Sequence, residues 1–326
     1  MGKFLIISIP TYNRADKLSR ILSLFLQEII KSQFKDEIGI FISNNGSTDN
    51  TMSAIISFDE KFTRAGIQFE YENKNKNIGM DLNYLNMIHA PNAKYIWFFS
   101  DDDVLFENRI DGLMTSIKKH MPSVCNFSFI QKPYDSCNFR YKGLNEGIYT
   151  DVKEYPTLVT TKISSCILST KHLGGYVIDD EVVVGTCWAY IPYIFSNLLE
   201  DNKLLIYPYP VASSDDDHLQ LRYDPIVFTN LYGLIESIYK KYNRECDFKQ
   251  SKIIKPVPMF TDINFLIKFI TDEVVLDDTH VEMIKKRIML NLLDYKLWLD
   301  FRMYKNILKL LFFTSRLKVF NVLGIK

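Results

Sequence analysis

Short apolar runs alternate with amphipathic segments along the first part of the chain, and this alternation predicts an α/β fold. The apolar runs have five or six residues and are rich in β-branched and aromatic side chains, as buried strands are. Between them, apolar residues recur three or four positions apart, as in helices that pack one face on a sheet. We expect a mainly parallel sheet flanked by helices. Its strands are expected at residues 4–9, 38–43, 67–71 and 94–99, and its helices through residues 18–29, 51–56, 80–89 and 110–117.

The pattern becomes less regular after residue 120. A polar, Tyr-rich segment up to residue 151 suits a hairpin or a flap. Further strands are expected at residues 124–130, 165–169 and 204–207, and a helix at residues 186–199. Beyond this point, apolar residues recur mostly at helical spacing. We therefore expect an α/β domain at residues 1–223 and a mostly helical C-terminal region at residues 224–326.

Composition gives no support to several classes of protein. The 326 residues include 39 Lys plus Arg and 39 Asp plus Glu, so the formal net charge is +0 and no nucleic-acid partner is expected. Five cysteines without metal-ligand spacing favour reduced thiols in a cytoplasmic protein. The chain has no run of about 20 apolar residues, so no membrane span is expected. Aromatic residues make up 14%, which suits either a Tyr- and Phe-rich core or a surface that binds sugars or bases.

Three consecutive carboxylates, Asp101–Asp103, follow the buried run at residues 94–99 and are the sharpest feature of the sequence. The carboxyl end of a parallel strand is where open α/β sheets bind ligands. One Asp there can be a plain helix cap, but three in a row repel one another unless a cation or solvent relieves them. Because hard divalent cations prefer oxygen ligands, we expect a metal site here.

Charge is distributed unevenly in the rest of the chain as well. Two further acidic triplets occupy residues 179–181 and 215–217, and His218 follows the second one. Residues 302–326 contain six Lys or Arg and no Asp or Glu, interleaved with apolar residues. A basic amphipathic helix of this kind is typical of a segment that lies on an anionic membrane. Packing of its apolar face on the body of the protein is the alternative.

Four motifs, each after a predicted strand, resemble those of glycosyltransferase family 2. They are SIPTYNR at residues 8–14, SNNGSTD at 43–49, NIG at 77–79 and FSDDDVL at 99–105. The resemblance is firm over about residues 3–120 and is strongest to bacterial enzymes of O-antigen or other surface-polysaccharide assembly, including abequosyltransferase-like members. It implies a GT-A type, Rossmann-like sheet, a nucleotide-diphosphate sugar as the donor and a lipid-linked glycan as the acceptor.

By this resemblance, the loops after the first two strands hold the nucleoside of the donor. Pro10, Tyr12 and Arg14 would lie on one loop, with Tyr12 near the base or ribose, and Asn44 and Asn45 on the other. Backbone amides at such strand ends also suit a nucleotide on physical grounds, although Pro10 can simply shape the turn. Relatives usually carry an acidic residue where Asn44 stands, so the base stays open among uracil, cytosine, thymine and guanine.

The resemblance also matches Asp101–Asp103 to the DXD motif of the family, which holds Mn2+ or Mg2+ against the donor diphosphate. Asp102 and Asp103 are expected to bind the metal, while Asp101 faces the donor or solvent. A cation at this place would stabilise the charge that develops on the departing nucleoside diphosphate. Asp81 opens the helix at residues 80–89 and is expected to reach the donor, unless it only caps that helix.

An inverting member of the family needs a general base that takes a proton from the acceptor hydroxyl. Relatives often show an acidic pair where Thr186 and Cys187 stand in this chain, so the nearest candidates are Asp180 and Glu181. A solvated acidic turn is the alternative for these two residues. The triplet at residues 215–217 with His218 is the other candidate.

The sequence thus predicts a metal-dependent glycosyltransferase at the cytoplasmic face of a bacterial membrane, bound there through residues 302–326. Two other functions stay open. A sugar-phosphate nucleotidyltransferase can share a related sheet, although the Gly-rich phosphate loop that it needs is not found at residues 10–14. A non-catalytic nucleotide-sugar-binding protein is favoured by the missing acidic pair and opposed by the intact Asp triplet.

Overall fold

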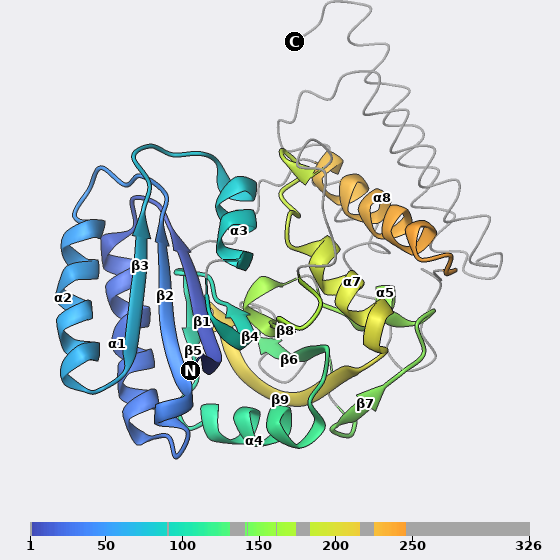
Figure 1. Ribbon diagram of the computed structural model, residues 1–326, viewed down its shortest axis with the longest axis horizontal. Helices are drawn as coiled ribbons and strands as arrows, with labels where there is room; N and C mark the ends of the chain where they lie inside the picture. The colour runs from blue at the N-terminus through green and yellow to red at the C-terminus, as the bar shows by residue number, and fades with distance from the viewer. Residues whose placement is uncertain are drawn as a thin grey trace, which may run out of the picture. The chain divides into compact units, whose positions relative to one another are not determined.

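The computed structural model describes residues 2–89, 91–130, 141, 143–160, 162–173, 183–215 and 225–245. These residues form a mixed α/β fold around one sheet, so the predicted fold class is confirmed (Figure 1). The chain divides into two compact units, residues 1–222 with 230–247 and residues 223–229 with 248–326. Of the described residues, only 225–229 belong to the second unit. The functional boundary expected at residue 223 stays a prediction.

The first half of the sheet is parallel and closely follows the apolar pattern. Its elements are β1 (Lys3–Thr11), α1 (Ala15–Lys31), η1 (Lys35–Glu37), β2 (Ile38–Asn44), α2 (Thr51–Arg64), β3 (Gln68–Asn73), α3 (Met80–His89) and β4 (Ala93–Phe98). The strands lie in the order β3-β2-β1-β4, and Ile7 of β1 is opposite both Ile40 of β2 and Trp97 of β4. All four strands are parallel, so their carboxyl ends and the loops that follow meet at one edge of the sheet.

The second half of the sheet mixes parallel and antiparallel pairs. Its elements are β5 (Asp103–Leu105), α4 (Ile110–His120), β6 (Val124–Ile130), β7 (Gly147–Tyr149), α5 (Tyr155–Leu158), η2 (Ile163–Ser165), β8 (Cys166–Ser169), α7 (Ile191–Asp201), β9 (Leu204–Ser214) and α8 (Pro225–Lys241). After β4 the order is β8-β6-β9-β5, and β7 also pairs with β9. Because β8 runs antiparallel to β4, its first residues lie beside the carboxyl end of β4. The turn η2 is thereby brought next to the Asp triplet.

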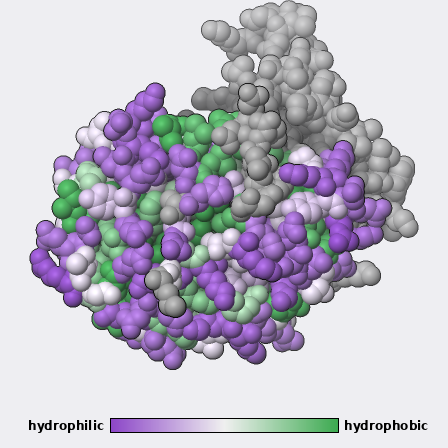
Figure 2. All heavy atoms as spheres, in the orientation of Figure 1, coloured by the Kyte–Doolittle hydropathy of each residue, from purple (hydrophilic) through white to green (hydrophobic). Residues whose placement is uncertain are grey.

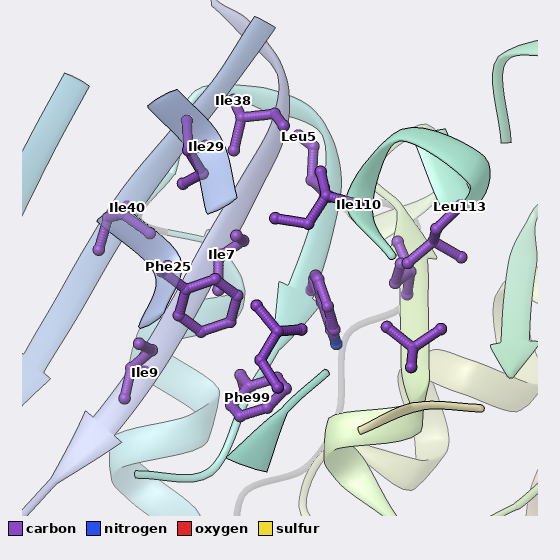
Figure 3. Packing of buried hydrophobic residues seen from close by; sticks show 14 of the residues in the cluster. Leu5, Ile7, Ile9, Phe25, Ile29, Ile38, Ile40, Phe99, Ile110 and Leu113 are labelled. Atoms are coloured by element: carbon purple, nitrogen blue, oxygen red, sulfur yellow. The ribbon is translucent and has the colours of Figure 1, made fainter. Parts of the chain in front are cut away.

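The hydrophobic core lies between the sheet and helices α1, α2 and α4. Figure 3 shows Phe25 and Ile29 of α1 packed against the sheet residues Ile7 and Ile9. The ring of Phe25 meets Phe99 edge to face at 5.0 Å between centroids. This packing fixes the end of β4, where the triplet begins, and it shows that part of the aromatic content belongs to the core.

The structure corrects two expectations. The helix expected at residues 186–199 begins at Ile191, because residues 184–190 form turns and bends and Cys187 adopts a left-handed backbone with φ 65°. Strand β5 starts inside the Asp triplet, where no strand was expected, and pairs with the end of β9.

The face of the molecule shown in Figure 2 is mainly hydrophilic. Within the described part of the chain, every helix is too short or too polar to cross a bilayer.

Candidate functional site

Two loops at the carboxyl edge of the sheet are tied together by hydrogen bonds. The amide of Asn13, after β1, donates to Ser47 Oγ at 2.9 Å, and the amide of Thr48, after β2, donates to Asn13 Oδ1 at 2.8 Å. The amide of Arg14 donates to Thr51 Oγ1 at 3.1 Å. Asn13 has φ 52°, a left-handed conformation that Asn tolerates better than most residues. The two loops therefore act as one preformed surface beside β1 and β2.

Asn44 and Asn45 connect this surface to the loop after β3. Asn44 is fully buried, and its amide donates to Asn73 Oδ1 at 2.9 Å. Asn45 donates to Asn77 Oδ1 at 3.0 Å and accepts from the amide of Ile78 at 3.0 Å. Both side chains thus shape the loops. Contact of either with the nucleoside stays a prediction.

The other residues predicted on the first loop differ in accessibility. Pro10 lies within β1, opposite Ser43 of β2. Tyr12 follows the strand and is 40% exposed, so its ring is open to solvent and able to stack on a flat ligand. Nucleotide binding by Pro10, Tyr12 and Arg14 stays a prediction.

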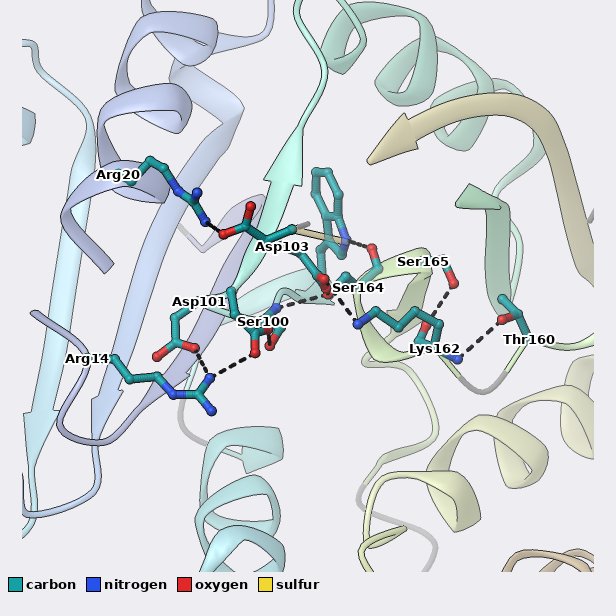
Figure 4. A network of polar contacts seen from close by, with 12 residues as sticks. Arg14, Arg20, Ser100, Asp101, Asp103, Thr160, Lys162, Ser164 and Ser165 are labelled. Atoms are coloured by element: carbon teal, nitrogen blue, oxygen red, sulfur yellow. Dashed lines mark hydrogen bonds and ion pairs between the residues drawn. The ribbon is translucent and has the colours of Figure 1, made fainter. Parts of the chain in front are cut away.

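Arg14 contacts two of the three Asp side chains after β4 (Figure 4). Its Nη1 lies 2.7 Å from Asp101 Oδ1 and 3.1 Å from Asp102 Oδ2. The hydroxyl of Ser100 donates to the other oxygen of Asp102 at 2.5 Å. The side chain of Arg14 is 44% exposed, so it lies at the boundary between the triplet and solvent.

Asp103 is held by a different set of residues, on the side of η2 (Figure 4). Lys162 Nζ lies 3.0 Å from Asp103 Oδ1, and the hydroxyl of Ser164 donates to Asp103 Oδ2. Ser164 is fixed in turn, because its hydroxyl accepts from the amide of Ser100 at 2.9 Å and its carbonyl accepts from Trp97 Nε1 at 2.8 Å. Sequence reasoning did not find Lys162 or Ser164, since no motif marks them and only the antiparallel insertion of β8 brings them to the triplet.

The surroundings of the three carboxylates shift the pKa values of Asp101 and Asp103 upward and that of Asp102 downward. Burial raises the pKa of Asp101, and the positive charge of Arg14 offsets only part of this rise. Burial likewise raises the pKa of Asp103, and Lys162 offsets only part of that rise. Burial also acts to raise the pKa of Asp102, but the Ser100 hydroxyl and nearby positive charges outweigh it, so this pKa lies below its ordinary value. Arg14 and Lys162 therefore balance part of the negative charge of the triplet, and the expected binding of a divalent metal stays a prediction.

Asp102 is the member of the triplet that best fits a divalent cation. Its side chain is 29% exposed, whereas those of Asp101 and Asp103 are 3% and 2% exposed. Both oxygens of Asp102 also accept hydrogen bonds, from Ser100 and Arg14, so its exposure is what distinguishes it from Asp101 and Asp103. In the described ranges, no three Asp, Glu, His or Cys side chains are arranged to hold a metal. A cation here would take few protein ligands and complete its shell with substrate and water oxygens, as Mg2+ often does.

Asp81 does not stand free at the start of α3. It is buried, and its Oδ2 accepts from the amides of Gly185 at 2.9 Å and Cys187 at 3.0 Å. Its Oδ1 lies 3.4 Å from the amide of Ala189. The carboxylate therefore faces the chain before α7, and its expected contact with the donor stays a prediction.

The remaining predicted residues lie mostly outside the described part of the chain. This is the case for Asp180, Glu181, the residues 216–218 and the basic segment 302–326. Asp215 is described, and its Oδ2 lies 2.7 Å from Nη2 of Arg20 on α1. The first member of that acidic triplet is thus ion-paired, and the identity of the general base stays a prediction.

Comparison with known proteins relates this geometry to a family. The model described as "Glycosyl transferase family 2" matches residues 6–171, just over half of the 326 residues. No curated protein matches the sequence.

Solved structures of TarS from S. aureus are similar to this chain. For TarS 1-349 in complex with UDP, the TM-score is 0.56 at 13% identity, over 85% of this chain and 73% of that one. For TarS 1-349 in complex with UDP-GlcNAc, the TM-score is 0.55 at 14% identity, over 73% and 66% of the two chains. Another crystal structure of TarS gives 0.56 at 13% identity, over 85% of this chain and 44% of that one. At this identity the likeness shows a shared fold.

Proposed function

Because the chain belongs to glycosyl transferase family 2, we propose that it transfers a sugar from a nucleotide-diphosphate donor to a lipid-linked oligosaccharide. The family membership makes it a glycosyltransferase, and the donor and acceptor are the proposed part. The observation that carries the proposal is Asp102, a partly exposed carboxylate at the carboxyl end of β4 and in contact with Arg14. The loops after β1, β2 and β3 form a preformed surface at the same edge, as a nucleotide site requires.

The residues at the triplet suit a diphosphate. Arg14 uses only Nη1 for its contacts with Asp101 and Asp102, so its other N–H groups can donate to phosphate oxygens. Mn2+ or Mg2+ held by Asp102 would stabilise the negative charge on the departing nucleoside diphosphate. Lys162 and Ser164 keep Asp103 in place beneath this site. TarS has been crystallised with UDP and with UDP-GlcNAc, so uridine nucleotides are the first donors to test.

The acceptor and the location are proposed from the sequence. The basic, apolar segment 302–326 suits the surface of an anionic membrane, where a lipid-linked acceptor is presented. We assign the transfer, with inversion, to O-antigen or other surface-polysaccharide synthesis at the cytoplasmic face of a bacterial membrane, by an enzyme of the abequosyltransferase-like kind. Asp180 or Glu181 is the proposed general base.

Thermal unfolding in the presence of nucleotides tests this function. A panel of nucleoside diphosphates and nucleotide sugars, including UDP and UDP-GlcNAc, is compared with and without Mn2+. At 100 times its Kd, a ligand stabilises the folded protein by about 2.7 kcal/mol, which is readily detected as a rise in Tm. We expect stabilisation by one nucleotide class that depends on Mn2+. A panel without any stabilising nucleotide would refute the proposal, and stabilisation without turnover would identify a non-catalytic binding protein.

A further inference from the structure

Residues 183–189, which we call the approach segment, lead into α7 along an irregular path. Gly185 has φ 86° and Cys187 has φ 65°, so two residues of this short segment adopt left-handed backbone conformations. Such a conformation is disfavoured for a residue with a side chain and persists only where surrounding contacts fix it. The contacts that fix Cys187 are therefore informative.

One carboxylate contacts three alternate amides of the approach segment. Asp81 accepts from the amides of Gly185 and Cys187 through Oδ2, at 2.9 and 3.0 Å, and its Oδ1 lies 3.4 Å from the amide of Ala189. Asp81 is only 6% exposed, so these charge-assisted hydrogen bonds are shielded from water. A hydrogen bond within the segment adds to these contacts, since Thr186 Oγ1 donates to the Val183 carbonyl at 2.6 Å.

Aromatic packing places the approach segment beside the carboxyl end of β4. Tyr84 of α3 meets Phe98, the last residue of β4, edge to face at 5.9 Å. The ring of Tyr84 also lies 5.5 Å from that of Tyr190, which directly follows the approach segment. Because Ser100 and the Asp triplet lie two to five residues after Phe98, the approach segment borders the same site.

Helix α3 is also fixed by hydrogen bonds to the loops proposed to bind the donor. Asn83 of α3 is buried and accepts from Ser43 Oγ at 2.6 Å, which ties the helix to the end of β2. Asn45 donates to the Gly79 carbonyl at 3.2 Å, just before the helix begins. Helix α3 is thus hydrogen-bonded to the loops proposed to bind the nucleotide. Through Asp81, the same helix is hydrogen-bonded to the approach segment.

We infer that Asp81 is a positioning residue that fixes the approach segment as the acceptor-side wall of the reaction site. The inference rests on the proposed glycosyltransferase function. The loops proposed to hold the nucleoside follow β1, β2 and β3, and the diphosphate is proposed to lie at the Asp triplet after β4. The approach segment reaches the end of β4 through Tyr190 and Tyr84, so it borders the diphosphate end of the donor, where the sugar is transferred. It carries the half-buried indole of Trp188, a side chain of the kind that packs on sugar rings. Loss of the hydrogen bonds between Asp81 and the approach segment should therefore impair transfer to an acceptor without weakening nucleotide binding.

The test compares Asp81→Ala and Asp81→Asn with a matched control, Asp16→Ala. Asp16 is the second residue of α1, as Asp81 is of α3, but it is exposed. Three properties are measured on the full chain with Mn2+. They are hydrogen exchange in residues 183–189, the Kd of UDP, and the rates at which UDP-GlcNAc gives up its GlcNAc group, with release of UDP, to n-octyl glycosides and to water. If another nucleotide stabilises the protein more strongly, it and its sugar replace the uridine pair.

We expect Asp81→Ala to speed exchange in the approach segment at least about tenfold and to lower transfer by about 10- to 100-fold, because small displacements at a reaction site have effects of this size. The UDP Kd and the hydrolysis rate should stay within about threefold, which a general loss of folding would not allow. Asp81→Asn keeps one acceptor oxygen and should be intermediate. Asp16→Ala should match the wild type.

Unchanged exchange in both Asp81 variants would overturn the inference, and so would faster exchange with an unchanged ratio of transfer to hydrolysis. A rise in the UDP Kd that matches the loss of transfer would assign Asp81 to the donor instead. If Asp81→Ala does not fold, Asp81→Asn decides the question by the same criteria. If the wild type binds no nucleotide and transfers no sugar, the proposed function fails, whereas exchange still shows whether Asp81 fixes the segment.

Discussion

Replacing Lys162 with Met removes the ammonium group that faces Asp103 and keeps most of the side-chain volume. Lys162 Nζ lies 3.0 Å from Asp103 Oδ1, and the two side chains are 38% and 2% exposed. Removing one partner of a fully buried pair costs about 3–5 kcal/mol, but the partly exposed ammonium is screened by water. The Ser164 hydroxyl still donates to Asp103 in the variant. We therefore expect the free energy of unfolding to fall by about 2 kcal/mol at pH 7.

The effect of Lys162→Met should depend on pH in a direction set by the pKa of Asp103. Burial already raises this pKa, and loss of Lys162 raises it further. The folded protein then holds the Asp103 proton to a higher pH than the unfolded chain does, so stability decreases as the pH rises through this window. The difference between variant and wild type should accordingly shrink as the pH falls, because protonation of the carboxyl group removes the negative charge that Lys162 balances.

Urea unfolding followed by circular dichroism at pH 7 and pH 4.5 measures both effects. Lys171→Met is the matched control, because Lys171 Nζ also lies 3.0 Å from an Asp oxygen, that of Asp201, while the side chains are 63% and 25% exposed. A pair this exposed contributes at most about 1 kcal/mol. Equal losses in the two variants, or a loss in Lys162→Met that does not change with pH, would refute the reasoning.

Two further substitutions test the loops at the sheet edge. Asn45→Ala removes the hydrogen bonds to Asn77 and Ile78, and we expect urea unfolding to show a loss of about 2 kcal/mol, with weaker UDP binding by calorimetry; unchanged stability and affinity would contradict this. Gly46→Ala places a Cβ 2.4 Å from the Lys76 backbone at φ 72°, so stability should fall by about 2 kcal/mol or more, and a fully stable variant would show that the turn does not need glycine.

Much of the fold follows from local pattern. The apolar pattern predicts α3 at Met80–His89 and β6 at Val124–Ile130 with the observed bounds, because their apolar residues are buried, in β6 as a continuous run. The start of α7 does not follow in this way. The helix begins only at Ile191, and the amides of Gly185 and Cys187 before it donate to Asp81, which lies 104 residues before Gly185. Helical spacing does not show such a contact.

The sequence motifs predict only part of the site. The order of strand ends and polar loops predicts where Asp101–Asp103 lie, because parallel strands carry their loops to one edge. The contacts of the triplet depend on tertiary structure. Lys162 reaches Asp103 because β8 enters the sheet antiparallel to β4, and Arg14 reaches Asp101 across 87 residues. Nothing in the sequence near residue 162 indicates such a role.

The central claim is that Asp102 supports metal-dependent transfer from a nucleotide sugar. The most direct test measures release of the nucleoside diphosphate from the nucleotide sugar that stabilises the protein most, with and without Mn2+, in the wild type and in Asp102→Asn. The account predicts that release by the wild type needs Mn2+ and that Asp102→Asn lowers the Mn2+-dependent rate by about 100-fold or more with the fold intact. A variant that retains the wild-type, Mn2+-dependent rate would contradict it.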